Sequence, residues 1–322
     1  MALATGIFDQ IYLGGGTPAE TLAGHIAFVQ EAERLGVERY HVTEHHGAPL
    51  TIVQPNEILA ALTQRTSRIR LGVLVNILPA HHPFALAEEI ASLDLLSGGR
   101  IDVGVGSGVV PYEMANVDVD TTTSKAVFAE RFPRLREALE TGRLGDAELA
   151  QPMLQDSLSL WYASANAPSA DWAARNGVNL VGWWTGGQMA EAAAAYHAAR
   201  AESEAMPNGP GIGLAGWILV GASDAEAEDR FHRAWATHSA RMLHIWHARG
   251  DHSFDFFADA QGLLDSGTCI AGGPATVREI MADRMSQLRS GYFEGHFYFG
   301  DLTADEAIAN LRRYLEEVAA RL

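Results

Sequence analysis

The chain has 322 residues, of which 48 % are apolar and 20 % charged, an ordinary composition for a globular protein with an extensive core. The formal net charge of −17 argues against nucleic acid or an anionic membrane surface as a partner, because both bind cationic faces. The single cysteine, Cys269, excludes an intramolecular disulfide, and no apolar run approaches the ~18 residues of a membrane span, so we expect a cytoplasmic protein.

Short apolar runs alternate with amphipathic stretches along the whole chain. The first run ends at Gly14, Gly15 and Gly16, after which Thr17, Pro18 and Glu20 predict a capping box with proline at the first helical position. The expected strands are residues 7–13, 40–42, 69–78, 101–105, 158–163, 180–184, 212–220 and 292–299. The expected helices are residues 18–36, 56–66, 83–96, 125–139, 169–176 and 188–205, with three more that begin at Ser223, Pro274 and Thr303.

Eight strands that alternate with helices predict βαβ units and a parallel sheet. An open, doubly wound sheet would show the same alternation, but eight repeats in this length favour a closed (β/α)8 barrel that spans residues 1–322 as one α/β domain. Residues 249–271 are the least regular segment and contain Gly, Asp, Ser and several aromatic residues. We expect this segment to be an insertion or a mobile loop that acts as a lid.

Polar or small residues stand at the ends of five expected strands, where a (β/α)8 barrel carries its active site. They are Glu44-His45-His46 after the second strand, Asn76 with His81-His82 after the third, Gly106-Ser107-Gly108 after the fourth, Ser164-Ala165-Asn166 after the fifth and Trp183-Trp184 at the sixth. We expect these residues to converge on one mouth of the barrel.

Glu44-His45-His46 is the sharpest of these features. Alternate side chains of a strand point to opposite faces, so Glu44 and His46 share a face and His45 takes the other. A metal site would need a ligand from another strand, and no metal-spaced Cys or His cluster accompanies the motif, so we assign no metal. One histidine could have a purely structural role, but three polar residues at the end of an apolar strand favour acid–base chemistry, which suits an imidazole of pKa ~6.5.

Two glycine-rich segments could either bind a ligand or serve only as a turn or a helix start. Gly104-Val105-Gly106-Ser107-Gly108 lacks the spacing of a dinucleotide fingerprint, and its glycines favour either close approach to a planar ligand or a tight turn. Gly272-Gly273-Pro274 stands where the general barrel rule places a phosphate, but it also reads as an ordinary helix start.

Two further segments have the same ambiguity. Asn166 and Ser169 begin an expected short helix, whose N–H groups could bind a phosphate or be capped by one of these side chains. Trp183 and Trp184 could wall a pocket for a flat ligand or belong to the core.

Several motifs together match one known family. They are Ala32-Glu33-Arg34-Leu35-Gly36, Val42-Thr43-Glu44-His45-His46, Leu78-Pro79-Ala80-His81-His82-Pro83, Leu93-Asp94-Leu95-Leu96-Ser97-Gly98-Gly99-Arg100 and Gly104-Val105-Gly106-Ser107-Gly108. With them the chain resembles the bacterial luciferase-like flavin-dependent monooxygenases over nearly its whole length, most specifically in its first third. The resemblance implies a (β/α)8 barrel that forms a homodimer or homotetramer. In such a barrel, reduced FMN from a separate flavin reductase and O2 oxygenate a small apolar organic substrate, such as an aldehyde.

The resemblance also implies roles for individual residues. His45 corresponds to the family's catalytic histidine and Glu44 to its neighbour in the motif. Leu74 and Val75 correspond to a non-prolyl cis peptide bond beneath the flavin ring. The remaining expected flavin-binding residues are Asn166 and Ser169 at the phosphate, Trp184 beside the ring, and Asn76, Gly106 and Ala165 at neighbouring strand ends.

The chain departs from the family at three places. Ser107 stands where arginine is common, and Lys125 keeps the positive charge of another common arginine without its bidentate fork, so modest FMN affinity is expected. Residues 249–271 match the luciferase mobile loop poorly, so neither light emission nor a long-chain aldehyde substrate is expected.

Three other functions are compatible with the same residues. A deazaflavin (F420)-dependent oxidoreductase on this barrel would transfer hydride without O2. A non-catalytic flavin-binding protein would hold oxidised flavin and turn over no substrate. A metal-dependent hydrolase on a barrel would need a metal in the purified protein.

Overall fold

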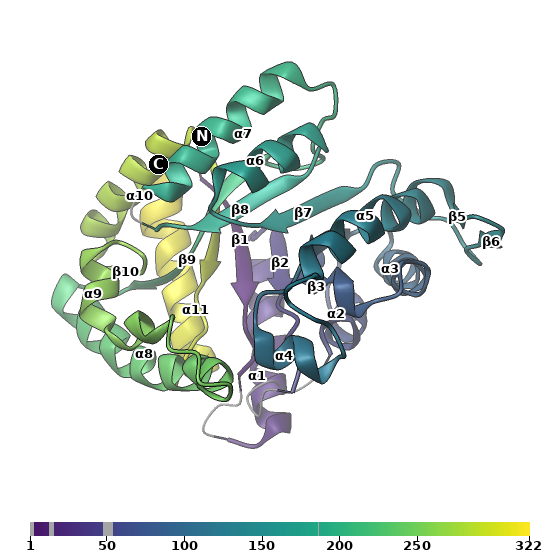
Figure 1. Ribbon diagram of the computed structural model, residues 1–322. Coiled ribbons are helices and arrows are strands. Elements are labelled where there is room, and N and C mark those ends of the chain that lie inside the picture. Colours follow the sequence, from purple (N-terminus) through teal and green to yellow (C-terminus); the bar gives the residue numbers. More distant parts are fainter. Residues whose placement is uncertain (1–2, 13–15, 48–53, 186) are drawn as a thin grey trace.

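The chain folds into a closed barrel of eight parallel strands (Figure 1). The computed structural model describes residues 3–12, 16–47, 54–185 and 187–322. The barrel strands are β1 (Ala4–Asp9), β2 (Arg39–Val42), β3 (Arg70–Ile77), β4 (Ile101–Gly106), β7 (Ser159–Ala163), β8 (Asn179–Trp183), β9 (Ile212–Val220) and β11 (Tyr292–His296). Each pairs with the next in parallel, and β11 pairs with β1, so the sheet closes. The barrel prediction is confirmed, and the open sheet is excluded.

Helices surround the barrel, most of them on the outer face of its strands (Figure 1). They are α1 (Pro18–Arg34), α2 (Pro55–Thr63), α3 (Pro83–Ser97), α4 (Pro111–Asn116), α5 (Ser124–Thr141), α6 (Ala167–Arg175), α7 (Gln188–Glu202), α8 (Asp224–His247), α9 (Ala260–Asp265), α10 (Pro274–Leu288) and α11 (Ala304–Arg313). The capping box predicted at Thr17 is present, and Thr303 forms another with Glu306 at the predicted start of α11. No helix within the described residues is long and apolar enough to cross a membrane.

The main core lies between the outer face of the strands and these helices. Phe28 of α1, Leu86 of α3 and Val277 of α10 are fully buried there. Burying a side chain of this size removes it from water and stabilises the fold by roughly 1.5–3 kcal/mol. The helices are therefore held on the sheet by apolar contact, which leaves the strand ends free to carry polar groups.

Several elements differ from the sequence expectation. The first strand begins at Ala4 and ends at Asp9, because its backbone pairs with both β11 and β2 although its first residues are small. The predicted end of that strand at Leu13, with Gly14 and Gly15, lies outside the described residues. Helix α4 and the hairpin of β5 (Arg143–Leu144) and β6 (Ala147–Glu148), which extends away from the barrel in Figure 1, were not anticipated.

Residues 249–271 contain more regular structure than expected. They form the 3-10 helix η2 (Asp255–Ala258), α9 and most of β10 (Ile270–Gly272), which pairs with β9. Phe257 and Leu263 are buried, and the Trp235 Nε1–H donates a hydrogen bond of 2.7 Å to the Phe257 carbonyl. The segment is thus anchored on α8, while its mobility as a lid stays a prediction.

A cluster of buried charges occupies the barrel interior. Asp102 of β4 accepts hydrogen bonds from Arg39 (2.6 Å), Arg70 (2.7 Å) and His41 Nε2 (3.1 Å). His41 Nδ1 lies 2.6 Å from a carboxylate oxygen of Glu294 on β11. The cluster therefore ties four barrel strands together beneath the mouth.

Candidate active site

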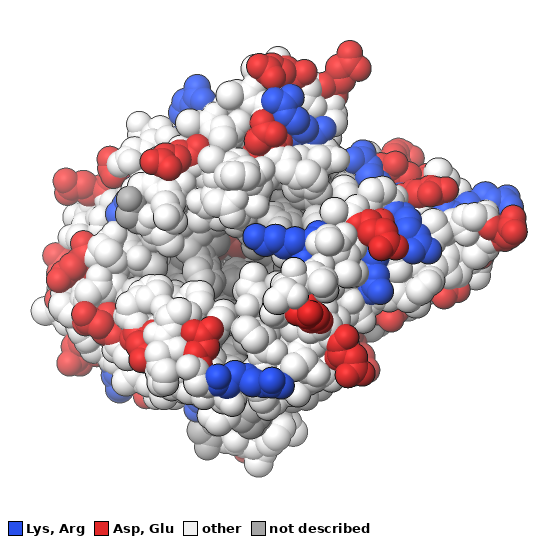
Figure 2. Space-filling view, in the orientation of Figure 1, with Lys and Arg blue, Asp and Glu red and all other residues white. Residues whose placement is uncertain are grey.

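A cavity of about 360 Å³ lies at the C-terminal ends of the barrel strands. Most of its lining is apolar and includes Phe8, Leu74, Val75, Ile77, Val181 and Trp183. In the space-filling view the molecule is hollowed near its centre, and most atoms around the hollow belong to uncharged residues (Figure 2). We call the cavity at the strand ends the mouth cavity.

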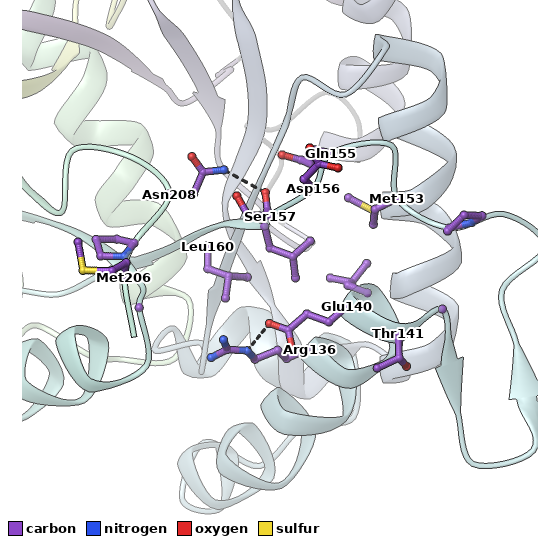
Figure 3. A pocket seen from close by; sticks show the side chains of 16 residues that line it. Arg136, Glu140, Thr141, Met153, Gln155, Asp156, Ser157, Leu160, Met206 and Asn208 are labelled. Carbon is purple, nitrogen blue, oxygen red and sulfur yellow. Dashed lines mark hydrogen bonds and ion pairs between the residues drawn. The ribbon is translucent and has the colours of Figure 1, made fainter. Parts of the chain in front are cut away.

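A larger cavity of about 650 Å³ lies at the opposite end of the barrel (Figure 3). Its walls come from the C-terminal turn of α5 and from the segments that precede β7, β8 and β9, including Arg136, Ser157 and Asn208. Function in (β/α)8 barrels resides at the C-terminal face, whereas the N-terminal face serves stability. The mouth cavity is therefore the candidate active site.

His45 lines the mouth cavity and is held by an acid that the sequence analysis missed. Its Nδ1 lies 2.7 Å from Glu113 Oε1, and Glu113 also accepts a hydrogen bond from the His46 backbone N–H. With the proton on Nδ1 donated to Glu113, His45 has only Nε2 left, and this atom is buried without a partner among the described residues. Nε2 is thus available to a bound molecule.

The charge of His45 is set by two opposing effects. Burial alone would lower the pKa of its imidazole, but the Coulomb attraction of Glu113 and their hydrogen bond outweigh burial and raise the pKa above its usual value. The protonated form is therefore favoured over a wider pH range than in water. This favours His45 as a proton donor over a general base.

Glu44 faces away from His45, as strand alternation predicted. Its Oε1 lies 2.6 Å from His46 Nε2 and 2.8 Å from His81 Nε2, and its Oε2 accepts a hydrogen bond from the Ile77 N–H. Burial works to raise the pKa of this carboxyl, but the hydrogen bonds from the two histidines lower it to about 2. Glu44 is therefore an ionised anchor for the β2 and β3 ends. It lines the mouth cavity, but both of its carboxylate oxygens already accept hydrogen bonds from these partners.

The peptide bond between Leu74 and Val75 is cis, as the family resemblance implied, and both residues line the mouth cavity. Asn76 does not join them. Its side chain is buried on the outer side of β3, where Nδ2 donates a hydrogen bond to the Gly104 carbonyl. Asn76 therefore joins β3 to β4 and is not among the residues that line the mouth cavity.

The expected phosphate end is built around the start of α6. Asn166 is the N-cap, and its Oδ1 accepts a hydrogen bond of 2.9 Å from the Ser169 N–H, while its Nδ2 donates to Ser164 Oγ. Burial raises the pKa of Tyr162, and the nearby hydroxyls of Ser107 and Ser169 partly offset this effect. Three hydroxyls and a helix N-terminus thus meet beside Ala165 and Gly106, both of which line the mouth cavity.

Lys125 lies on the first turn of α5, where its side chain is exposed. It is three residues before Phe128, whose ring packs against Tyr162 at 5.6 Å. It is not among the residues that line the mouth cavity, and its contact with a phosphate stays a prediction. Ser107, which replaces a common arginine of the family, remains at the mouth cavity as a hydroxyl donor.

Two other candidate positions lie outside the mouth cavity. At Gly272-Gly273-Pro274, the Asp224 carboxylate accepts a hydrogen bond of 2.7 Å from the Gly273 N–H, which favours the ordinary helix start over a phosphate site. Trp184 is buried outside the mouth cavity under the Arg284 guanidinium, 3.5 Å from the ring centroid. Trp183 lines the cavity instead, since adjacent strand residues face opposite ways.

Two more polar residues at the mouth escaped the sequence analysis. Gln10 lines the mouth cavity, and its buried Oε1 has no partner among the described residues. Tyr12 stacks on His45 with ring centroids 6.4 Å apart. Burial and the nearby Glu113 raise the pKa of Tyr12, so its hydroxyl keeps its proton. Both residues lie within three positions after the end of β1, and this location after a barrel strand was the one signal in the sequence that could have identified them.

The sequence matches the luciferase-like monooxygenase family over residues 3–290. It is 28 % identical to the uncharacterized protein y4wF of Sinorhizobium fredii over 99 % of this chain and 97 % of the relative. It is also 28 % identical to limonene 1,2-monooxygenase of Rhodococcus erythropolis, over 83 % of this chain and 72 % of the relative.

Solved structures share the fold. The monooxygenase RslO1 of Streptomyces bottropensis superimposes with a TM-score of 0.83 at 20 % identity, over 98 % of both chains. The FMN-bound oxygenating constituent of 3,6-diketocamphane monooxygenase from Pseudomonas putida gives 0.81 at 19 % identity, over 100 % of this chain and 99 % of that one. The F420-dependent tetrahydromethanopterin reductase of Methanopyrus kandleri gives 0.71 at 17 % identity, over 99 % of each.

Proposed function

The chain belongs to the luciferase-like monooxygenase family, and on that premise we propose that it uses reduced FMN and O2 to oxygenate a small, largely apolar organic molecule. The observation that carries this proposal is the pair of His45 and Glu113 at an otherwise apolar mouth cavity. A histidine that can donate a proton within largely apolar walls suits a reaction in which one oxygen atom leaves as water.

The residues of the mouth fit a flavin mononucleotide. The buried, unpartnered Nε2 of His45 can hydrogen-bond the reacting edge of the ring. The α6 N-terminus with the hydroxyls of Ser107 and Ser169 provides donors for a phosphate, and Lys125 provides charge. When bound, reduced FMN would supply two electrons and the centre that activates O2.

The chain's own groups then have distinct tasks. His45 holds a proton at Nε2, and Glu113 fixes the ring and keeps that proton in place. Leu74, Val75 and Val181 form dry walls that exclude water from the reacting atoms. Gln10 offers an acceptor oxygen to a donor group on the bound molecules.

The substrate class follows from this lining. Apolar walls favour a molecule that loses hydrophobic surface on entry, and few polar groups are present to fix its orientation. The relative limonene 1,2-monooxygenase is named for a hydrocarbon, which supports an apolar substrate. An aldehyde or a cyclic ketone of similar size would fit the same chemistry.

A deazaflavin-dependent hydride transfer is the second candidate, since an F420-dependent enzyme shares the fold. A non-catalytic flavin-binding role is less compatible with the proton held at His45. We also propose that a separate flavin reductase supplies the cofactor and that the protein works as a homodimer or homotetramer in the cytoplasm. These points rest on the family alone.

One experiment separates the candidates. The purified protein is titrated anaerobically with reduced FMN and, separately, with reduced F420, and the loaded protein is then mixed with O2 and a panel of apolar aldehydes, ketones and alkenes. Incorporation of labelled oxygen from O2 into one of these compounds would establish the monooxygenase. Binding of F420 without binding of FMN would replace it with the hydride-transfer enzyme.

Lys125→Ala is expected to weaken FMN binding by about tenfold, because a charge-assisted contact with phosphate is lost. Lys125→Arg should retain binding. The chain has a single lysine, so bound FMN should also protect this one side chain from acetylation, as read by mass spectrometry. Arg143→Ala in the exposed β5–β6 hairpin is the matched control and should leave affinity unchanged. Equal acetylation of Lys125 with and without FMN would contradict its assignment.

A further inference from the structure

Three side chains of types that commonly bind metal ions lie close together at the surface, between the end of α8 and the start of η2. His247 is the last residue of α8, His252 lies in the turn that follows, and Asp255 is the first residue of η2. Their ligand atoms all lie within 4.8 Å of one another. His247 Nε2 is 2.5 Å from one oxygen of Asp255, and His252 Nδ1 is 3.0 Å from the other.

We propose that His247, His252 and Asp255 bind a divalent transition-metal ion of the Zn²⁺ type. Two imidazole nitrogens and one carboxylate form a donor set that Zn²⁺ accepts, with water in the remaining position. Mg²⁺ and Ca²⁺ prefer oxygen ligands and would bind poorly here. Both oxygens of Asp255 already point at the histidines, so the three ligands need to shift by little to surround an ion.

The surroundings favour a cation. The side chains of His247, His252 and Asp255 are 41 %, 65 % and 51 % exposed, so an ion and its waters can enter from solvent. Asp251 lies beside His252 and adds a second negative charge to the site. This cluster is separate from the mouth cavity, and its occupancy does not depend on the flavin proposal.

The ion would cross-link the lid segment. It joins the end of α8 to η2 across residues 248–254, and within that span Phe254 stacks on Trp246 with ring centroids 4.1 Å apart. Trp246 belongs to one buried cluster with Val110, which lines the mouth cavity. Metal binding therefore stabilises the packing of this segment against the cavity rim.

Metal binding is measured by isothermal titration of the protein, freed of any histidine tag, with ZnCl2. One equivalent should bind, and MgCl2 should give no comparable heat. His247→Gln, His252→Gln and Asp255→Asn should each weaken Zn²⁺ binding by at least about tenfold, since even loss of an outer-shell partner costs ~10- to 100-fold. His82→Gln removes an exposed histidine elsewhere and should bind as the wild type. Equal affinity in all four variants would overturn the site.

The cross-link is measured by limited trypsin digestion, because Arg249 is exposed between two of the ligands. Zn²⁺ should slow cleavage after Arg249 severalfold in the wild type and in His82→Gln. It should not slow cleavage there in His252→Gln or Asp255→Asn. Cleavage at other arginines reports any effect of Zn²⁺ on trypsin itself. The three ligands are at the surface, so the variants should fold, and circular dichroism checks each. An unchanged rate at Arg249 with Zn²⁺ bound would refute the cross-link.

Discussion

Replacing His45 with alanine is expected to lower the rate of substrate oxygenation by ~10²- to 10⁴-fold, the usual contribution of a positioned acid or base. The physical reason is loss of the proton held at Nε2, which faces no other partner among the described residues. FMN affinity should fall much less, because the phosphate end of the site is untouched. The measurement is single-turnover oxygenation of the reduced, FMN-loaded protein, with product counted by mass spectrometry. A variant that oxygenates at the wild-type rate would exclude His45 from the chemistry.

Glu113→Gln tests whether the charge of Glu113 keeps His45 protonated. Glu113 raises the pKa of His45, so activity that needs protonated His45 is present at lower pH and lost as pH rises through that raised pKa. The glutamine keeps the size and a hydrogen-bond acceptor but removes the charge, and the alkaline limb of the pH–rate profile should move to lower pH. A merely structural role for Glu113 would reduce activity equally at every pH. Glu57→Gln, an exposed substitution on α2, is the control and should leave the profile unchanged.

Asp102→Asn is expected to lower the free energy of unfolding by about 3–5 kcal/mol, the usual effect of removing one partner from a buried ion cluster. The substitution leaves Arg39, Arg70 and His41 facing a neutral amide inside the barrel. Urea unfolding followed by tryptophan fluorescence measures the change. Asp171→Asn breaks an exposed ion pair with Arg175 and should cost less than ~1 kcal/mol. A similar loss in both variants would show that the cluster contributes no more than a surface pair.

The same cluster makes stability depend on pH. Burial would lower the pKa of His41, but Glu294 and Asp102 raise it to about 9. A raised pKa means that the folded state holds the proton more tightly than the unfolded chain. The stabilisation is therefore complete below the ordinary histidine pKa and is lost as pH rises through about 9. In Asp102→Asn this alkaline loss should begin at lower pH, as thermal unfolding across the pH range would show.

The barrel itself was predictable because its signals are local. Alternating apolar runs, capping boxes at Thr17 and Thr303, and glycines at helix ends are each read within a few residues. The cis bond at Leu74–Val75 was identified only through the family motifs, whereas capping of α6 by Asn166 was one of two roles that the local sequence allowed. Small shifts, such as the start of β1 at Ala4, arose because strand pairing extends an element beyond its apolar residues.

The sequence by itself determined the fold class and singled out His45, Asn166 and Ser169 as candidate site residues, since each depends on residues close together in the chain. Only the tertiary structure decided which acid holds His45, because Glu113 lies 68 residues away. It also decided the face of each strand-end residue. Adjacent strand residues point in opposite directions, so Trp183 reaches the mouth cavity while Trp184 does not, and a one-residue register cannot be read from composition. The cluster of His247, His252 and Asp255 likewise exists only because a turn and η2 bring its members together at the end of α8.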